Sequence, residues 1–192
     1  MSYKLRNTKI VFLDRDGVIN AYPGDFQYVK SWGEFRFLPG IKTALKRLND
    51  AGFKILVISN QAGVGKGIYS QDELDLITEN MLSELSEKGV KISGVYYCTH
   101  RKEEECSCRK PKAGLVDIAI AKLKTEGAVI DLKESYFVGD TIRDIETGKV
   151  RHLKTILIFS GKENPENKDS WQAQPDFTAR DLTGAADIIL KG

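Results

Sequence analysis

Short hydrophobic segments alternate along the chain with segments in which hydrophobic residues recur every three or four positions. The short segments predict buried strands at 10–13, 55–58, 92–97, 136–138 and 155–159. The periodic segments predict helices around 41–48, 74–85, 115–123, 142–145 and 182–189. Ser70 and Glu73 have the spacing of a capping box before the second of these helices. The polar stretch 160–176 is expected to be a surface loop.

This alternation predicts a single α/β domain over residues 1–192, built as a doubly wound parallel sheet with helices on both faces. In such sheets, ligands bind beyond the carboxyl ends of the strands. Polar residues that follow the predicted strands should therefore converge at one edge of the sheet. They are Asp14, Asp16, Ser59, Asn60, Cys98, His100 and Asp140.

Length and composition narrow the class of protein. A chain of 192 residues with 41% hydrophobic residues can bury a sizeable core. Its net charge of +2 provides no strong field for nucleic acid or a membrane surface. No hydrophobic run approaches the ~18 residues that a spanning helix needs, and the polar start over 1–9 does not resemble a leader peptide. We therefore expect a cytoplasmic monomer with neither nucleic-acid nor membrane partners.

Several aspartates follow the predicted strands. Residues two apart in an extended chain point the same way, so Asp14 and Asp16 can face one ligand while Arg15 faces elsewhere. Asp140 follows the fourth strand, and its carboxylate would repel the first two unless a cation lay among them. Ligation by oxygen alone favours Mg²⁺. Asp144, taken alone, is interpreted as a helix cap or a supporting residue.

Groups suited to phosphate follow two other predicted elements. Ser59, Asn60 and Gln61 offer a hydroxyl and two amides ahead of a glycine-rich stretch, which lacks the spacing of a P-loop. Arg109 and Lys110 provide cations before the next helix.

All three cysteines lie in one short window with a histidine. Cys98, His100, Cys106 and Cys108 supply three thiols and an imidazole, which is a closed tetrahedral set for zinc. Because four protein ligands leave no open position, this Zn²⁺ is expected to be structural. The clustering and the odd number argue against a disulfide scaffold.

In this order along the chain, Asp14-x-Asp16-Gly17, Ser59-Asn60, Lys110 and Gly139-Asp140-x₃-Asp144 resemble the four motifs of the haloacid dehalogenase-like phosphatases. The resemblance extends from residue 11 to about residue 159. The cysteine and histidine run, followed by Arg109-Lys110-Pro111, resembles the zinc-containing branch of this family. That branch includes phosphatases for D-glycero-D-manno-heptose 1,7-bisphosphate and for histidinol phosphate. The resemblance implies a doubly wound fold without a large cap domain.

The resemblance also implies roles for the residues. Asp14 would form an aspartyl-phosphate, and Asp16 would protonate the leaving group and then deprotonate water. Mg²⁺ would be held by Asp14, Asp140 and the backbone carbonyl of Asp16. Ser59 and Lys110 would bind phosphoryl oxygens, with Lys110 counted among the catalytic residues. The substrate would be positioned by Asn60, Gln61 and Arg109.

The substrate is the more open question. The polar groups near the motifs and the single-domain length favour a sugar phosphate, the 7-phosphate of D-glycero-D-manno-heptose 1,7-bisphosphate. The short zinc loop favours histidinol phosphate, as does Thr141, where close relatives often carry a basic residue.

Three other functions fit less well. A non-enzymatic phospho-switch would not need the second carboxylate of Asp16. A nucleic-acid 3′-phosphatase would share the chemistry, although the zinc loop argues against it. A zinc-knuckle module for nucleic acid is opposed by the acidic run 103–105.

Overall fold

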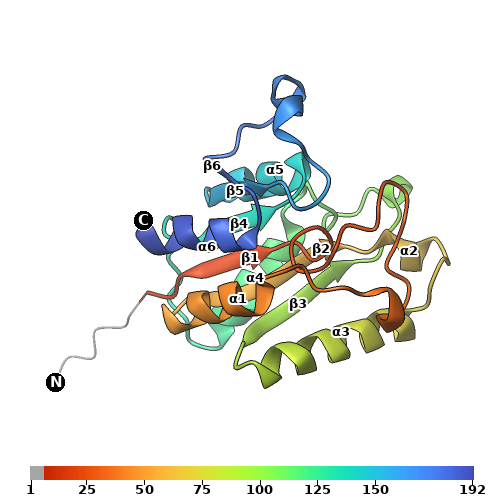
Figure 1. Ribbon diagram of the computed structural model, residues 1–192, viewed down its shortest axis with the longest axis horizontal. Coiled ribbons are helices and arrows are strands. Elements are labelled where there is room, and N and C mark those ends of the chain that lie inside the picture. Colours follow the sequence, from red (N-terminus) through yellow and green to blue (C-terminus); the bar gives the residue numbers. More distant parts are fainter. Residues whose placement is uncertain (1–6) are drawn as a thin grey trace.

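The computed structural model describes residues 7–192, so the first six residues of the predicted domain and most of its polar start lie outside the described part. One parallel sheet forms its centre, with the strand order β3-β2-β1-β4-β5-β6 (Figure 1). The strands are β1 (Ile10–Leu13), β2 (Lys54–Asn60), β3 (Ile92–Cys98), β4 (Tyr136–Gly139), β5 (Lys154–Ile158) and β6 (Phe177–Ala179).

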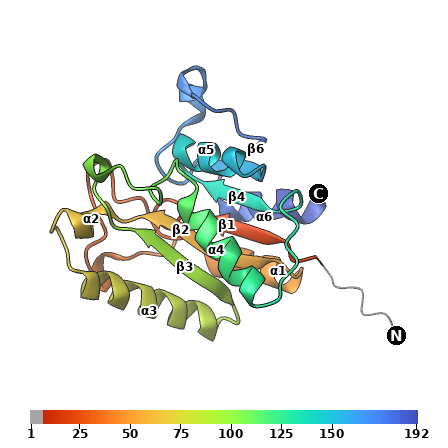
Figure 2. The same ribbon diagram turned by 180° about the vertical axis from the view of Figure 1, so that it is seen from behind.

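Helices cover both faces of this sheet. They are α1 (Ile41–Asp50), α2 (Ala62–Gly65), α3 (Gln71–Glu87), α4 (Gly114–Thr125), α5 (Ile142–Val150) and α6 (Leu182–Lys191). Short 3₁₀ turns occur at Trp32–Glu34, Lys102–Glu104 and Pro165–Ser170. Helices α1, α3 and α6 pack into one hydrophobic core, and α4 packs into a second core on the opposite face (Figures 1 and 2). The predicted doubly wound architecture is confirmed.

The sequence of β1 is hydrophobic at every position, with no alternation of hydrophobic and polar residues. Val11 and Leu13 face the core of α1, α3 and α6, whereas Ile10 and Phe12 face the core of α4. All four residues are fully buried. A strand covered by helices on both faces has no solvent side, and so it carries no polar alternation.

The strand order places the site. From β1 the chain moves outward to β2 and β3, and it then returns to the other side of β1 to form β4. The connections that leave β1 and β4 therefore diverge at the carboxyl ends of two adjacent strands, which opens a crevice there. Asp14 and Asp140 are the first residues beyond these two strands.

Most predicted elements are confirmed, with ends that differ by a few residues. The predicted capping box is present: Ser70 N donates to Glu73 at 2.7 Å, and Glu73 N donates to the Ser70 hydroxyl at 3.1 Å. Two elements were not predicted: the short helix α2 in the glycine-rich stretch after β2, and strand β6, which follows directly after the predicted 160–176 loop. Over residues 7–192, no helix has both the length and the hydrophobicity needed to cross a membrane.

Candidate active site

Three aspartates meet at the crevice between β1 and β4. Oxygen atoms of Asp14, Asp140 and Asp144 lie within 4.8 Å of one another, and all three residues are buried. Gly17 permits this close approach, because a Cβ there would lie 2.2 Å from an Asp140 carboxylate oxygen. Its φ of +82° also belongs to the region that favours glycine. The Asp-x-Asp-Gly spacing thus lets the chain turn beside Asp140.

Lys110 connects these carboxylates. Its ammonium lies 2.8 Å from Asp14 Oδ2 and 2.6 Å from Asp144 Oδ1, and it donates to the Ile58 carbonyl at 2.9 Å. Burial alone would lower the pKa of Lys110, but Asp14 and Asp144 raise it, so the side chain stays charged. Asp144 in turn accepts hydrogen bonds from the amide and hydroxyl of Thr141 at the start of α5. Asp144 is therefore both the N3 residue of the capping box of α5, whose N-cap is Thr141, and an anchor for Lys110.

The charges of this cluster do not balance. Three carboxylates and one ammonium, all buried, carry a net of two negative charges. Asp140 Oδ1 is buried without a hydrogen-bond partner. Burial, together with the nearby Asp14 and Asp144, raises the pKa of Asp140 well above the ordinary range for a carboxyl group. A divalent cation bound by oxygen would balance the charge and give Asp140 its missing partner, so these residues fit Mg²⁺.

The carboxylate of Asp16 belongs to a different set of contacts. It accepts three hydrogen bonds from Arg15 at 2.9–3.1 Å, one from Asn20 at 2.9 Å and one from Gln61 at 2.9 Å. Burial would raise its pKa, but the Arg15 guanidinium and these hydrogen bonds lower it. Arg15 itself is fully buried, and its guanidinium turns back to Asp16.

Two amides that were expected to contact substrate make internal contacts. Asn60 and Lys110 exchange two hydrogen bonds through the Lys110 backbone, at 3.0 and 3.2 Å. Gln61 is only 2% exposed, and its amide contacts Asp16, Ser59 and Tyr69. Asn60 still lines the cleft described below, whereas Gln61 does not. The structure thus gives Gln61 a role behind the cleft and not on its surface.

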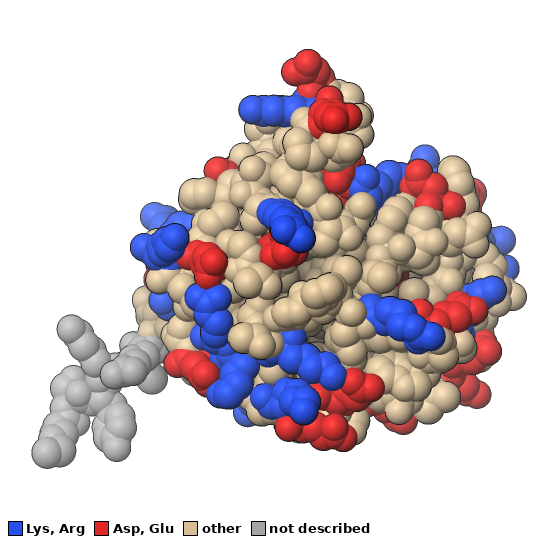
Figure 3. All heavy atoms as spheres, in the orientation of Figure 1, with Lys and Arg blue, Asp and Glu red and all other residues tan. Residues whose placement is uncertain are grey.

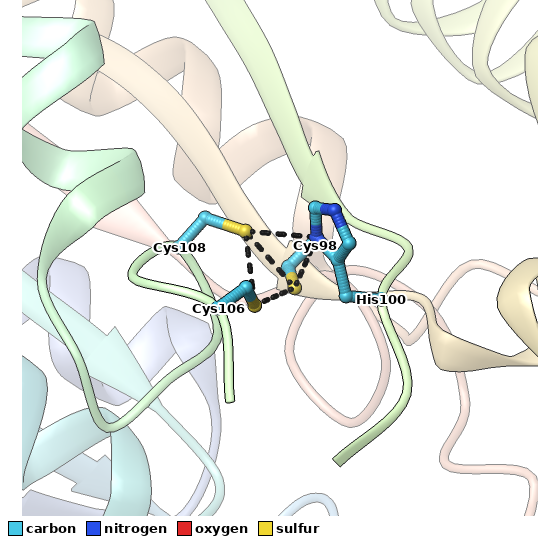
Figure 4. A group of neighbouring side chains, drawn as sticks. All are labelled: Cys98, His100, Cys106 and Cys108. Carbon is cyan, nitrogen blue, oxygen red and sulfur yellow. Dashed lines mark hydrogen bonds between the residues drawn. The ribbon is translucent and has the colours of Figure 1, made fainter. Parts of the chain in front are cut away.

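The cysteine and histidine side chains also converge. Sulfur atoms of Cys98, Cys106 and Cys108 lie 3.3–3.5 Å apart, and His100 Nδ1 lies 3.2 Å from Cys108 Sγ and 3.8 Å from Cys98 Sγ (Figure 4). A tetrahedral zinc with bonds of ~2.3 Å places sulfur ligands roughly 3.7 Å apart. These four side chains could therefore hold zinc. They lie on the end of β3 and on the loop that leads to Arg109 and Lys110.

Asp14, Asp16 and Asp140 line a cleft of about 350 Å³. One wall is the segment 22–28 between β1 and α1, which includes the fully exposed Phe26. Asp25 of this segment pairs with Lys162 at 2.7 Å across the mouth. The sequence reasoning missed four further residues of the lining, because nothing in their local pattern marks them. They are Lys102, Glu103, Arg143 and Lys162.

A strand-end aspartate held by a buried lysine, beside a carboxylate group suited to a divalent cation, defines a phosphatase of the haloacid dehalogenase-like class. The comparisons agree. The family described as polynucleotide kinase 3 phosphatase matches residues 9–190. The chain is 37% identical to the D-glycero-beta-D-manno-heptose-1,7-bisphosphate 7-phosphatase of Haemophilus influenzae, over 80% of this chain and 83% of that protein.

Two further relatives match almost the whole chain. The D-glycero-D-manno-heptose-1,7-bisphosphate 7-phosphatase of Chlorobaculum tepidum is 34% identical over 98% of this chain and 97% of its own. The crystal structure of D,D-heptose 1,7-bisphosphate phosphatase from B. bronchiseptica, complexed with magnesium and phosphate, superposes with a TM-score of 0.84. It is 28% identical and covers 96% of this chain and 99% of its own. The chain belongs to the polynucleotide kinase 3 phosphatase family, within the haloacid dehalogenase-like phosphatases.

Proposed function

We propose that this chain is a Mg²⁺-dependent phosphatase that removes the 7-phosphate of D-glycero-D-manno-heptose 1,7-bisphosphate through an aspartyl-phosphate on Asp14. The observation that carries the proposal is the buried cluster of Asp14, Lys110, Asp140 and Asp144, of which Asp14, Lys110 and Asp140 line a cleft. The names of the relatives support the choice of substrate.

Asp14 is held as a nucleophile. Its Oδ1 accepts from the Arg15 backbone amide at 2.7 Å, and its Oδ2 lies 2.8 Å from the Lys110 ammonium. Attack forms a bond between an Asp14 oxygen and phosphorus while the bond from phosphorus to the substrate oxygen breaks. Lys110 and the Ser59 hydroxyl, which both belong to the lining of the cleft, would bind phosphoryl oxygens as charge develops. Mg²⁺ held by Asp14, Asp140 and the Asp16 carbonyl would neutralise the oxygens of the transferring group.

Asp16 moves the protons in this scheme. In its acid form it protonates the departing sugar oxygen, and as the anion it then takes a proton from the water that hydrolyses the aspartyl-phosphate. Arg15 lowers the pKa of Asp16, which suits the second step. The proton for the first step arrives with the substrate when it binds as a phosphate monoanion. After hydrolysis, Asp16 passes the proton that it took from water to the product, which leaves as H₂PO₄⁻, and Asp14 and Asp16 are both restored as anions.

The cleft suits a small substrate with two anionic groups. Basic side chains line the cleft. Lys66 and Arg109 belong to the segments beyond β2 and β3, and Arg143 and Lys162 belong to the segments beyond β4 and β5. Long nucleic acids need extended basic surfaces. On the face drawn in Figure 3, Lys and Arg side chains are instead interspersed with Asp and Glu. A sugar bisphosphate is therefore the better fit.

The Cys98, His100, Cys106 and Cys108 group would hold one Zn²⁺ with a structural role. The last of these ligands is followed directly by Arg109 and Lys110. Fixing the loop at Cys108 therefore fixes the backbone from which Lys110 reaches Asp14. With four protein ligands, the ion would have no open position for chemistry.

Steady-state kinetics test this proposal. We expect Mg²⁺-dependent phosphate release, with kcat/KM highest for heptose 1,7-bisphosphate, lower for histidinol phosphate and lowest for a 3′-phosphorylated oligonucleotide. Asp14→Asn should reduce kcat by about 10³-fold or more, because an amide in place of the Asp14 carboxylate cannot form the acyl phosphate. Asp169→Asn, at an exposed position of the loop after β5, is the matched control. Near-normal turnover by Asp14→Asn would refute the nucleophile, and a preference for histidinol phosphate would refute the substrate.

A further inference from the structure

The buried side-chain amide of Gln61 contacts both Asp16, the proposed acid, and Ser59, a proposed ligand of the phosphoryl group. Gln61 follows β2 directly and donates through Nε2 to Asp16 Oδ2 at 2.9 Å and to the Ser59 hydroxyl oxygen at 3.1 Å. Its carbonyl oxygen accepts from the Tyr69 hydroxyl at 2.6 Å. Gln61 and Ser59 are each 2% exposed and Tyr69 is 4% exposed, so water does not compete for these contacts.

These contacts have only one consistent direction. An ionised Asp16 carboxylate only accepts, so the NH₂ end of Gln61 must face it. The carbonyl end then faces Tyr69, whose hydroxyl must donate. Because the second N–H of Gln61 is given to Ser59 Oγ, the hydroxyl hydrogen of Ser59 is left to point away from Gln61. The orientation of the Gln61 amide thus leaves the Asp16 carboxylate as a hydrogen-bond acceptor and the Ser59 hydroxyl as a hydrogen-bond donor.

The fold is built to bring Tyr69 to this amide. Gly63, in the short helix α2, has no side chain where the Tyr69 ring lies. A Cβ at this position would be 2.1 Å from that ring and 2.9 Å from the Tyr28 ring. The backbone of α2 can therefore lie against Tyr69 only with glycine here. Tyr69 lies just before α3 begins, and its ring packs against Gly63 of α2, which places the hydroxyl beside Gln61.

We propose that Gln61, oriented by Tyr69, is a positioning pair that aims the Asp16 carboxylate for proton transfer to the leaving group. The inference rests on the proposed function, because it needs Asp16 as the acid. Without the Tyr69 hydroxyl, the Gln61 carbonyl loses its partner in a buried place, and the amide is free to turn its oxygen toward Asp16. The Asp16 carboxylate would then face the Gln61 carbonyl oxygen, which repels it, where the Gln61 NH₂ group now donates a hydrogen bond.

Leaving groups provide a readout that a purely structural role would not change. An alkoxide leaves poorly without a proton, whereas nitrophenolate leaves as the anion. Misplacement of the Asp16 carboxylate therefore slows the hydrolysis of an alkyl phosphate far more than that of 4-nitrophenyl phosphate. The constant to compare is kcat/KM, because it reports transfer to Asp14 and excludes the later hydrolysis step. The alkyl ester is whichever of heptose 1,7-bisphosphate and histidinol phosphate the wild-type chain hydrolyses faster.

For Tyr69→Phe we expect the ratio of kcat/KM for the alkyl ester to that for the aryl ester to fall about 10-fold, and for Gln61→Leu about 100-fold. The double variant should have the same ratio as Gln61→Leu, since Tyr69 acts only through Gln61. Tyr136→Phe removes a buried tyrosine hydroxyl at the far end of β4, and it should leave the ratio unchanged. Thermal melting shows whether each variant is folded at the assay temperature.

Each outcome decides the question. An equal loss on both esters, or additive effects in the double variant, would overturn the positioning role while leaving the phosphatase proposal intact. If Tyr69→Phe does not fold, the comparison of Gln61→Leu with Gln61→Asn decides, because the shorter amide keeps a donor but cannot reach both partners. An unchanged ratio for Gln61→Leu overturns the inference. A wild-type chain that hydrolyses neither alkyl ester refutes the proposed function itself, and the positioning role with it.

Discussion

Replacing the charge of Asp140 should separate the stability of the metal-free protein from its response to Mg²⁺. Asp140→Asn keeps the size of the side chain and removes one of the three buried carboxylates around Lys110. In the metal-free protein this change relieves repulsion. In the presence of Mg²⁺ it removes the ligand whose Oδ1 has no other partner. The same substitution should therefore be harmless without the ion and costly with it.

The distances set the size of both effects. Two like charges 4.8 Å apart, which is the upper limit of the separation here, repel by about 3.5 kcal/mol at an effective dielectric constant of 20. Asp140 has two such neighbours, and Lys110 offsets one of them. Because the raised pKa of Asp140 already leaves part of the population protonated, the relief is smaller than this figure. Binding of Mg²⁺ at 100 times its Kd would stabilise the wild type by about 2.7 kcal/mol.

Thermal unfolding followed by circular dichroism measures these quantities. A change of 1 kcal/mol shifts the Tm of a chain of this size by roughly 2–4 °C, so saturating Mg²⁺ should raise the wild-type Tm by roughly 5–10 °C. Asp140→Asn should respond by less than about 2 °C. Magnesium is to be removed by dialysis without a chelator, because a chelator would also strip metal from the cysteine cluster. Asp169→Asn serves as the control and should respond like the wild type.

Two results would refute this reasoning. A metal-free Asp140→Asn protein that melts well below the metal-free wild type would show that the carboxylate stabilises the fold by itself. An undiminished response to Mg²⁺ would show that the ion binds elsewhere. Either result would remove the charge argument on which the magnesium site depends.

Three further predictions concern other parts of the chain. Cys108→Ser should lose one zinc per chain, measured by elemental analysis, and most of the activity, while the far-UV circular dichroism spectrum stays unchanged. A purified wild-type protein that contains no zinc would contradict the assignment. Burial would raise the pKa of Asp176, but hydrogen bonds from Lys149 and Thr155 lower it, so its contribution to stability is present above pH ~4 and is lost as the pH falls through the folded pKa. Asp176→Asn should therefore lower the Tm at pH 7 more than at pH 3, and an equal loss at both would argue against the ion pair. Ser135→Ala removes a fully buried hydroxyl that accepts from the Ile10 amide at 2.9 Å, and denaturant unfolding should show a loss of about 1–3 kcal/mol; a loss below 0.5 kcal/mol would mean that the amide finds another partner.

The sequence by itself determined the order of the secondary structure and the place of the site. Buried strands and amphipathic helices are visible because their patterns repeat within a few residues of one another. The parallel sheet then brings the ends of β1, β2 and β4 to one edge, whatever the details of packing. The cysteine cluster was equally predictable, since its four ligands fall within one short window. Strand β6 carried no comparable signal, because three residues at a sheet edge, two of them exposed, show no pattern.

Only the tertiary structure decided which contacts each side chain of the site makes. Asp14 and Asp16 share a motif, yet the carboxylates beside Asp14 are those of Asp140 and Asp144, while Asp16 turns to Arg15 and Gln61. The physical reason is distance along the chain. A pattern in the sequence reports neighbours within one or two turns, whereas Gln61, which donates to Asp16, lies 45 residues away, and Asn60, which holds the backbone of Lys110, lies 50 residues away. Which oxygen meets which donor is settled only when those segments pack.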